Sequence, residues 1–348
     1  MESVSCLNSS SSAAVFSSSE KIAPLLRAYN SGSTEVEFSE LLETATLLLG
    51  EPPLHAADGL GYSDLNSNGS PLQWLLSIKK NTIANRLIAD PAFYLKDVET
   101  RSAKSLEALR HFVQVCDAPT LLEPCLRAVE SIIPKQRDEL RKYETGIIRL
   151  AVPADLQGLA MYVGAQPGLV NSWEPVKLWV NDQLNNSSAA VELIESLEDI
   201  SRFFGIGIQG VSQKLGRVKI YWRITESVAL SRFQCPLFVD ENLNLFLDKI
   251  MQGREFPLHA LTFSAGFKLS TGDLNDIKVD VCNTSIGFSR QEAVDFIQDQ
   301  IHHCELHKDY MHETICALKH HNIQFGAIGY GVNVKDESRI NSYLYANY

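Results

Sequence analysis

The sequence predicts an α+β fold in which ten antiparallel strands close into a barrel and a ring of helices packs outside it. Three observations support this prediction. Short segments with strand character occur in five pairs, each joined by a turn, and segments with helical periodicity separate the pairs. Four segments place cationic side chains on one phase of a predicted strand, with apolar residues in most of the opposite phase. They are Arg217–Tyr221, Lys177–Trp179, Lys278–Asp280 and, less cleanly, Arg339–Tyr345.

The first expected hairpin is bounded by clear turn signals. It joins Leu72–Ile78 to Ile83–Asp90 across a polar four-residue link, and Gly69-Ser70-Pro71 precedes it. The other four expected pairs are Ala160–Gln166 with Val176–Asn181, Gly207–Gln213 with Arg217–Ile224, Leu261–Ser270 with Ile277–Cys282, and Gln324–Val334 with Arg339–Ala346.

Helices are expected between and before these pairs. Apolar residues recur at three and four positions in Ser39–Leu49, Ser102–Val115, Ala118–Tyr143, Ala189–Phe204 and Asn242–Met251. A further long helix begins at Ser289, where Glu292 follows three residues later and completes a capping box. Closing the ten strands removes the exposed sheet edges, and a ten-stranded barrel encloses a larger solvent-filled chamber than an eight-stranded one.

Composition limits the class of protein. The 348 residues carry a formal net charge of −11, which argues against a general nucleic-acid binder and against binding to anionic membranes. Seven scattered cysteines without CxxC spacing indicate reduced thiols, and no apolar run is long enough to span a membrane, so a soluble, cytoplasmic protein is expected. Residues 1–22 are expected to form a disordered, serine-rich tail, and residues 23–348 a single barrel domain.

The inward phase of the predicted barrel is unusually basic. The cations expected to share its chamber are Arg86, Lys177, Arg217, Lys219 and Lys278. Few carboxylates accompany them, Asp280 being the clearest, and burying unpaired charge is costly. The missing counter-charge is therefore expected to be a ligand, and a diphosphate with about three negative charges suits a mixed Arg and Lys site. Interleaved aromatic residues add ring faces that attract a cation: Trp179, Tyr221, Tyr343 and Tyr345.

Plainer interpretations exist for each of these residues. An inward cation can be a charge at the barrel rim that pairs with a loop carboxylate. Tyr343 and Tyr345 are also compatible with core or edge positions, and Gln73 with an ordinary strand residue.

A second group of candidate residues is rich in histidine. It comprises His302, His303, Cys304, His307, His312, Cys316, His320 and His321. His303 and His307 share a helical face, which permits a zinc site, but the segment lacks an HExxH motif and its other spacings place ligands on different faces. A solvated outer helix is the favoured interpretation, and no metal site is assigned.

Several of these features together resemble the ABBA-fold aromatic prenyltransferases, specifically the indole or dimethylallyltryptophan synthase type. They are the helix and hairpin repeat, Ser70-Pro71-Leu72-Gln73 before a strand, Arg86, Lys177-Leu-Trp179 and Arg217-Val-Lys219-Ile-Tyr221. The chain's ending, Ser338–Tyr345, is similar to that of cyanobacterial members that act on cyanobactin peptides or on hapalindole-type indole alkaloids.

The resemblance implies the activity and the roles of individual residues. The expected enzyme transfers a dimethylallyl or geranyl group from its diphosphate to an indole acceptor, an alkaloid being favoured over a cyclic peptide. The diphosphate ligands would be Arg86, Lys177, Arg217, Lys219 and Lys278, and the cation shield would be Trp179, Tyr221, Tyr343 and Tyr345.

The catalytic base is the main departure from the family pattern. Gln73 stands where fungal members carry a glutamate, so deprotonation falls to Asp280, water or the released diphosphate. No cofactor is required, although Mg²⁺ is possible beside Asp280. The alternative from another class is a non-catalytic barrel that binds an isoprenoid phosphate.

Overall fold

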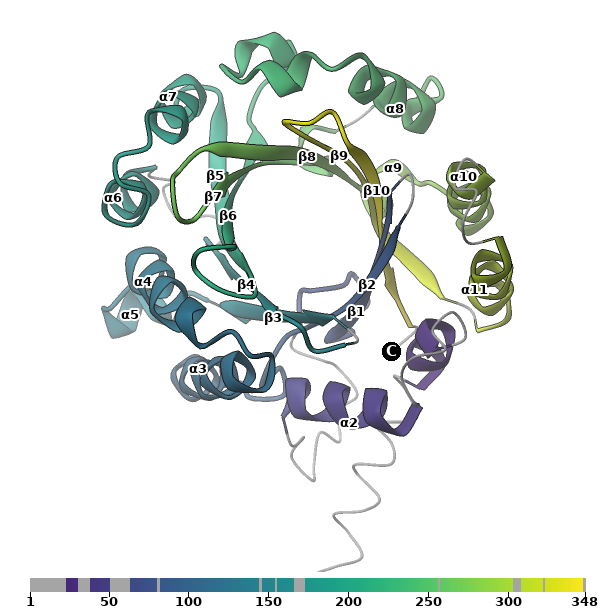
Figure 1. Ribbon diagram of the computed structural model, residues 1–348, viewed down its shortest axis with the longest axis horizontal. Coiled ribbons are helices and arrows are strands. Elements are labelled where there is room, and N and C mark those ends of the chain that lie inside the picture. Colours follow the sequence, from purple (N-terminus) through teal and green to yellow (C-terminus); the bar gives the residue numbers. More distant parts are fainter. Residues whose placement is uncertain are drawn as a thin grey trace, which may run out of the picture.

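The computed structural model describes residues 23–30, 38–50, 63–79, 82–143, 146–153, 155–165, 173–255, 257–302, 308–321 and 323–346. The predicted serine-rich tail at 1–22 lies outside this range. Ten antiparallel strands close into a barrel in the order β1-β10-β9-β8-β7-β6-β5-β4-β3-β2, and helices form a ring around it (Figure 1). The predicted fold class is confirmed.

The strands form five hairpins along the chain. Their bounds are β1 Leu72–Lys79, β2 Ile83–Ala89, β3 Ile148–Pro153, β4 Leu159–Gly164, β5 Ser201–Gly210, β6 Arg217–Ile224, β7 Leu261–Lys268, β8 Leu274–Cys282, β9 Gln324–Asn333 and β10 Ser338–Tyr345. The first, third, fourth and fifth predicted hairpins are confirmed, although β5 begins earlier than expected because its preceding helix ends at Leu197.

The second predicted hairpin is wrong in its pairing. The partner of β4 is β3, in which Arg149 lies opposite Tyr162, whereas residues 176–181 lie in helix α6, Glu174–Gln183. The buried residues of that helix are Val176, Trp179 and Val180, which is a three-and-four spacing. The alternation of Lys177 and Trp179 is therefore a fragment of an amphipathic helix.

The helices surround the barrel and cover its outer face. Those with described bounds are α2 Phe38–Leu49, α3 Val98–Val115, α4 Leu122–Ile132, α5 Arg137–Leu140, α6, α7 Ser188–Leu197, α8 Glu241–Met251, α9 Asn283–Ile286, α10 Arg290–His302 and α11 Lys308–His320. The single helix predicted over residues 118–143 is broken after Ile132, where Pro134 follows within two residues. The predicted capping box is confirmed, because the amide of Ser289 donates to Glu292 Oε2 at 2.8 Å and the amide of Glu292 donates to Ser289 Oγ at 3.2 Å.

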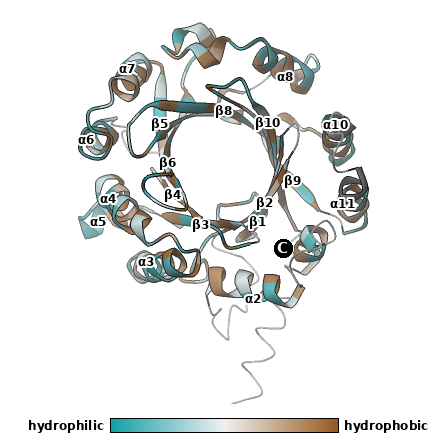
Figure 2. Cartoon of the chain, in the orientation of Figure 1, coloured by the Kyte–Doolittle hydropathy of each residue, from teal (hydrophilic) through white to brown (hydrophobic). Residues whose placement is uncertain are grey.

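The main hydrophobic core lies between the barrel and its helices. Outward strand residues such as Trp74 and Trp222 are fully buried there, and Figure 2 shows hydrophobic segments on both strands and helices. Inward residues in the middle of strands, including Leu75 and Tyr221, remain partly exposed. Solvent therefore reaches the barrel interior, and the outward face of the sheet is the dry one.

The antiparallel order gives the barrel two different ends. All five hairpin turns lie at one end, here called the turn end, and the connections through helices lie at the other, the helix end. Residues near the start of β6, β8 and β10 therefore approach the turn end, and residues near the start of β1 approach the helix end. No described helix has the length and apolar character needed to cross a membrane.

Candidate active site

The inward faces of three strands place charged side chains near the turn end. Strand β6 contributes Arg217 and Lys219, β8 contributes Asp276 and Lys278, and β10 contributes Arg339. Pairing brings them to common levels, because Lys219 and Asp276 both lie opposite Gly266 of β7, while Lys278 and Arg339 both lie opposite Gly331 of β9.

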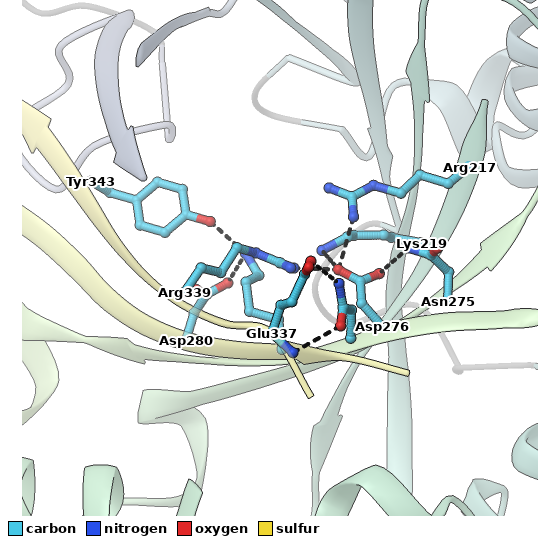
Figure 3. A network of polar contacts seen from close by, with 10 residues as sticks. Arg217, Lys219, Asn275, Asp276, Asp280, Glu337, Arg339 and Tyr343 are labelled. Carbon is cyan, nitrogen blue, oxygen red and sulfur yellow. Dashed lines mark hydrogen bonds and ion pairs between the residues drawn. The ribbon is translucent and has the colours of Figure 1, made fainter. Parts of the chain in front are cut away.

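Asp276 is the centre of this arrangement. Its carboxylate is fully buried, accepts from Arg217 Nη1 at 2.9 Å, lies 3.3 Å from Lys219 Nζ, and pairs with Arg339 (Figure 3). Burial acts to raise the pKa of Asp276, but the three cations hold that pKa far below its usual range. Asp276 is therefore ionised at neutral pH.

Burial opposes the charge on two of the cations. It lowers the pKa of Lys219 well below its ordinary value, and Arg217 and Arg339 act in the same direction, while Asp276 opposes the shift. The pKa of Arg217 is also lowered by burial, with Arg339 and Arg86 adding to the effect. Arg86 of β2 thus lies close enough to Arg217 to belong to the same electrostatic group.

Lys278 lies between this group and two tyrosines. Its ammonium pairs with Asp280, donates to the hydroxyl of Tyr343, and sits 5.0 Å and 5.8 Å from the ring centroids of Tyr343 and Tyr221. Burial acts to lower the pKa of Lys278, but Asp280 and Tyr221 more than offset it and leave the pKa raised. Burial raises the pKa of Tyr221 and of Tyr343, so both phenols are neutral.

These residues form the basic cluster, defined here as Arg86, Arg217, Lys219, Lys278 and Arg339 with the carboxylates Asp276 and Asp280. Five cations face two anions, so within the described part of the barrel the cluster has an excess of three positive charges. The expectation of few carboxylates is therefore only partly right, because Asp276 is a second and more central counter-ion than Asp280.

A collar of three tyrosines adjoins the basic cluster. Tyr162 of β4 and Tyr221 pack edge to face with centroids 6.2 Å apart, and Tyr343 approaches from β10. Gly207 of β5 makes room for the first two, because a Cβ atom there would lie 2.8 Å from the Tyr162 ring and 3.1 Å from the Tyr221 ring.

Beyond the collar the interior becomes apolar. Ile88, Ala151 and Ala160 form a small cluster separate from the outer core, and Leu65, Leu75, Tyr162 and Tyr343 pack against it. The collar tyrosines thus contact the basic cluster on one side and apolar side chains on the other.

Gln73 lies at the helix end of this apolar region, paired across the hairpin with Ile88. Asn66 donates through Nδ2 to the carbonyls of Ser70 and Leu72, so its Oδ1 must accept, and Gln73 Nε2 donates to it at 2.9 Å. This network fixes the amide of Gln73 and leaves Oε1 as an acceptor, for which the described residues supply no hydrogen-bond donor. Tyr345 lies at the same end, with its hydroxyl 3.0 Å from Ser67 Oγ.

Two predicted site residues do not face the interior. Lys177 on α6 forms an ion pair with Glu198, and both side chains are about one-third exposed. Trp179 is 1% exposed within the outer core. Their predicted inward positions are wrong, since the second hairpin instead presents Arg149, Ala151, Ala160 and Tyr162 to the interior.

Sequence reasoning placed Arg339 on an inward strand phase without giving it a ligand role, and it assigned no role to Asp276 or Tyr162. Asp276 lies two residues before Lys278, so strict alternation along β8 was the available signal for it. Tyr162 carried no such signal, because the true second hairpin was not recognised.

The histidine-rich run is only partly described. His303, Cys304 and His307 lie outside the described residues. On α11, Cys316 Sγ lies 3.6 Å from His312 Nε2.

Comparisons with known proteins identify the fold. No protein-family model and no curated protein matches the sequence. Among solved structures, the chain is similar to 5-dimethylallyltryptophan synthase from Streptomyces coelicolor, with a TM-score of 0.69, 13% identity, and coverage of 92% of this chain and 95% of that one. It is similar to the prenyltransferase PriB at a TM-score of 0.72 and 14% identity over 93% and 94% of the two chains, and to AnaPT from Neosartorya fischeri at 0.63 and 10% over 94% and 92%. The chain therefore has the ABBA barrel fold of these aromatic prenyltransferases.

Proposed function

We propose that this protein is an aromatic prenyltransferase that transfers a dimethylallyl or geranyl group from its diphosphate to an indole-containing acceptor. The observation that carries the proposal is the basic cluster, whose three excess positive charges lie beside the tyrosine collar inside the barrel. A diphosphate supplies about the missing charge, and the tyrosine faces suit a carbocation.

Structural neighbours give this proposal its chemical context. PriB has been solved with product diphosphate and with L-tryptophan and dimethylallyl thiolodiphosphate. The S. coelicolor synthase has been solved with DMASPP and Trp. Those ligands belong to those proteins, and they support a prenyl diphosphate and an indole acceptor here.

The proposed reaction begins with cleavage of the bond between the allylic carbon and the diphosphate oxygen. The electron pair leaves with the diphosphate, whose developing charge is stabilised by the basic cluster. The allyl cation formed on the other side of the broken bond faces Tyr162, Tyr221 and Tyr343. An indole carbon then donates a π-electron pair to the allyl cation, and loss of the proton from that carbon restores the aromatic ring.

Gln73 is suited to orient the acceptor. Its Oε1 is directed by the Asn66 network and can accept a hydrogen bond from an indole N–H, but an amide cannot remove the ring proton. The proposed proton acceptors are therefore Asp280 and the released diphosphate. Because Asp280 Oδ2 already contacts the Lys278 ammonium, the carboxylate is a poor fit for Mg²⁺, and no step uses a metal ion.

The acceptor is proposed to be an indole alkaloid of the hapalindole type, as in alkaloid biosynthesis of cyanobacterial origin, with Trp or Tyr of a cyclic peptide as the alternative. The apolar stretch formed by Ile88, Ala151 and Ala160 favours an acceptor with a largely uncharged body.

Turnover decides between an enzyme and a barrel that merely carries isoprenoid phosphates. Purified protein is incubated with dimethylallyl or geranyl diphosphate and with tryptophan, a neutral indole alkaloid or a cyclic peptide, and both diphosphate and prenylated product are quantified. Equal amounts of the two products are expected. Tight binding of the prenyl diphosphate without release, with every acceptor, would instead identify a carrier.

A further inference from the structure

Asp276 has no part in the bond changes proposed above, yet it is the most enclosed charged group of the basic cluster. Its carboxylate is 0% exposed and lies against the backbone of β7, where a Cβ atom on Gly266 would come within 2.0 Å of Oδ1. The carboxylate of the aspartate therefore lies at the barrel wall.

The position of Asp276 lets one carboxylate hold cations from both sides. Arg217 and Lys219 come from β6 and Arg339 from β10, each two strands away from β8 in the barrel order. Lys219 depends on this contact most, because its side chain is about 5% exposed while that of Arg217 is 25% exposed. A guanidinium also keeps its proton far more firmly than an ammonium does.

Among the described residues, the other charged groups that act on Lys219 oppose its charge. They are Arg217 on its own strand, Lys278 on β8 and Arg339 on β10, and burial acts in the same direction. The neighbouring strands β5 and β7 present Gly207 and Gly266 at the paired positions, which carry no side-chain charge. Within this described set, Asp276 raises the pKa of Lys219.

We propose that Asp276 is a positioning residue that keeps Lys219 protonated and holds Arg217 and Arg339 directed inward while the diphosphate site is empty. This inference rests on the proposed function. Without Asp276, Lys219 loses its proton in the empty protein and recovers it only when a diphosphate arrives. Diphosphate binding then becomes coupled to proton uptake.

Calorimetric titration with inorganic diphosphate tests this coupling. Binding to the wild type, D276N and D276N/K219R is measured from pH 7 to 9 in buffers of different ionisation enthalpy, which reports the protons taken up. D276N should take up about one proton more than wild type, and its affinity should fall up to about tenfold more per pH unit. D276N/K219R should lose this extra dependence, because arginine stays charged. Equal proton uptake by wild type and D276N would overturn the proposal.

Thermal unfolding provides a second test of the role of Asp276 that needs no ligand. D276N should have a lower Tm than wild type. Adding K219M should recover much of this loss, because K219M removes the buried ammonium that pairs with Asp276 in the wild type. A double variant no more stable than D276N would contradict the proposed pairing, even if D276N itself fails to fold. Wild-type protein that binds no diphosphate would refute the proposed function. The comparison of Tm values among wild type, D276N and D276N/K219M would still test the pairing of Asp276 with Lys219.

Discussion

Arg217→Ala provides a direct test of the basic cluster. The arginine contacts Asp276 at 2.9 Å while its side chain remains 25% exposed, so its remaining N–H groups can reach a ligand in the interior. A hydrogen bond between charged groups contributes about 1.5–3 kcal/mol, and the partial exposure favours the lower half of this range. We expect R217A to weaken diphosphate binding by roughly 10- to 50-fold, and kcat/KM for the prenyl diphosphate to fall at least as much.

Lys177→Ala is the matched control, because it removes a cation that sequence reasoning placed in the same site. Lys177 belongs to α6 and pairs with Glu198 at a partly exposed position, where an ion pair contributes about 0–1 kcal/mol to stability. Calorimetry with inorganic diphosphate and steady-state kinetics on both variants should show a loss for R217A alone. If both variants retain wild-type affinity, or if K177A loses as much as R217A, the assignment of the site is wrong.

Three further substitutions probe the collar, the capping box and the corrected helix. Gly207→Ala adds a Cβ atom 2.8 Å from the ring of Tyr162 and so displaces the collar. We expect kcat/KM to fall by about 10- to 100-fold, while calorimetry shows unchanged diphosphate affinity. Unaltered turnover would contradict the role of the collar. Hydrogen bonds from Ser289 lower the pKa of Glu292 to about 2, from an ordinary value of 4.5, so its stabilisation is present above pH 4.5 and lost as the pH falls towards 2. Chemical unfolding should show E292Q less stable than wild type at pH 7, with a difference that shrinks below pH 4; a difference independent of pH would refute this. Trp179→Ala should cost about 3–5 kcal/mol of unfolding free energy without weakening diphosphate binding, and weakened binding in folded protein would return Trp179 to the site.

The fold was largely predictable because its hairpins carry local signals. Turns rich in Gly, Asn and Asp separate strands whose period of two is regular, as in Arg217–Ile224. The second hairpin was missed although its connection contains Asp155 and Gly158, because β3 and β4 have only six residues each and β3 is one nearly continuous apolar run. Lys177-Leu-Trp179 was therefore interpreted as part of a strand although it belongs to helix α6. Three residues are too few to distinguish the period of two of a strand from one face of a helix.

The candidate site was predictable only where alternation within one strand sufficed. Arg217, Lys219 and Tyr221 follow from a single strand, and so does the inward position of Lys278. The pairing of Asp276 with cations from β6 and β10 depends on strand order and register, which no single segment encodes. The tyrosine collar could not be predicted for the same reason. The contact between Tyr162 and Tyr221 depends on the pairing of β4, β5 and β6, which places Gly207 between the two rings.

The distribution of charge along the barrel meets the main requirement of the proposed reaction, the ionisation of an allylic diphosphate inside an acidic protein. Asp276 and Asp280 lie against glycines of neighbouring strands, Gly266 and Gly329, so their negative charge stays at the barrel wall. The cations can then project farther inward than their counter-ions, and Arg217 remains partly exposed. In the proposed reaction, the leaving group moves towards the excess of cations while the allyl cation stays at the tyrosine collar. Separating the two products in this way stabilises the transition state more than the substrate, which is the condition for catalysis.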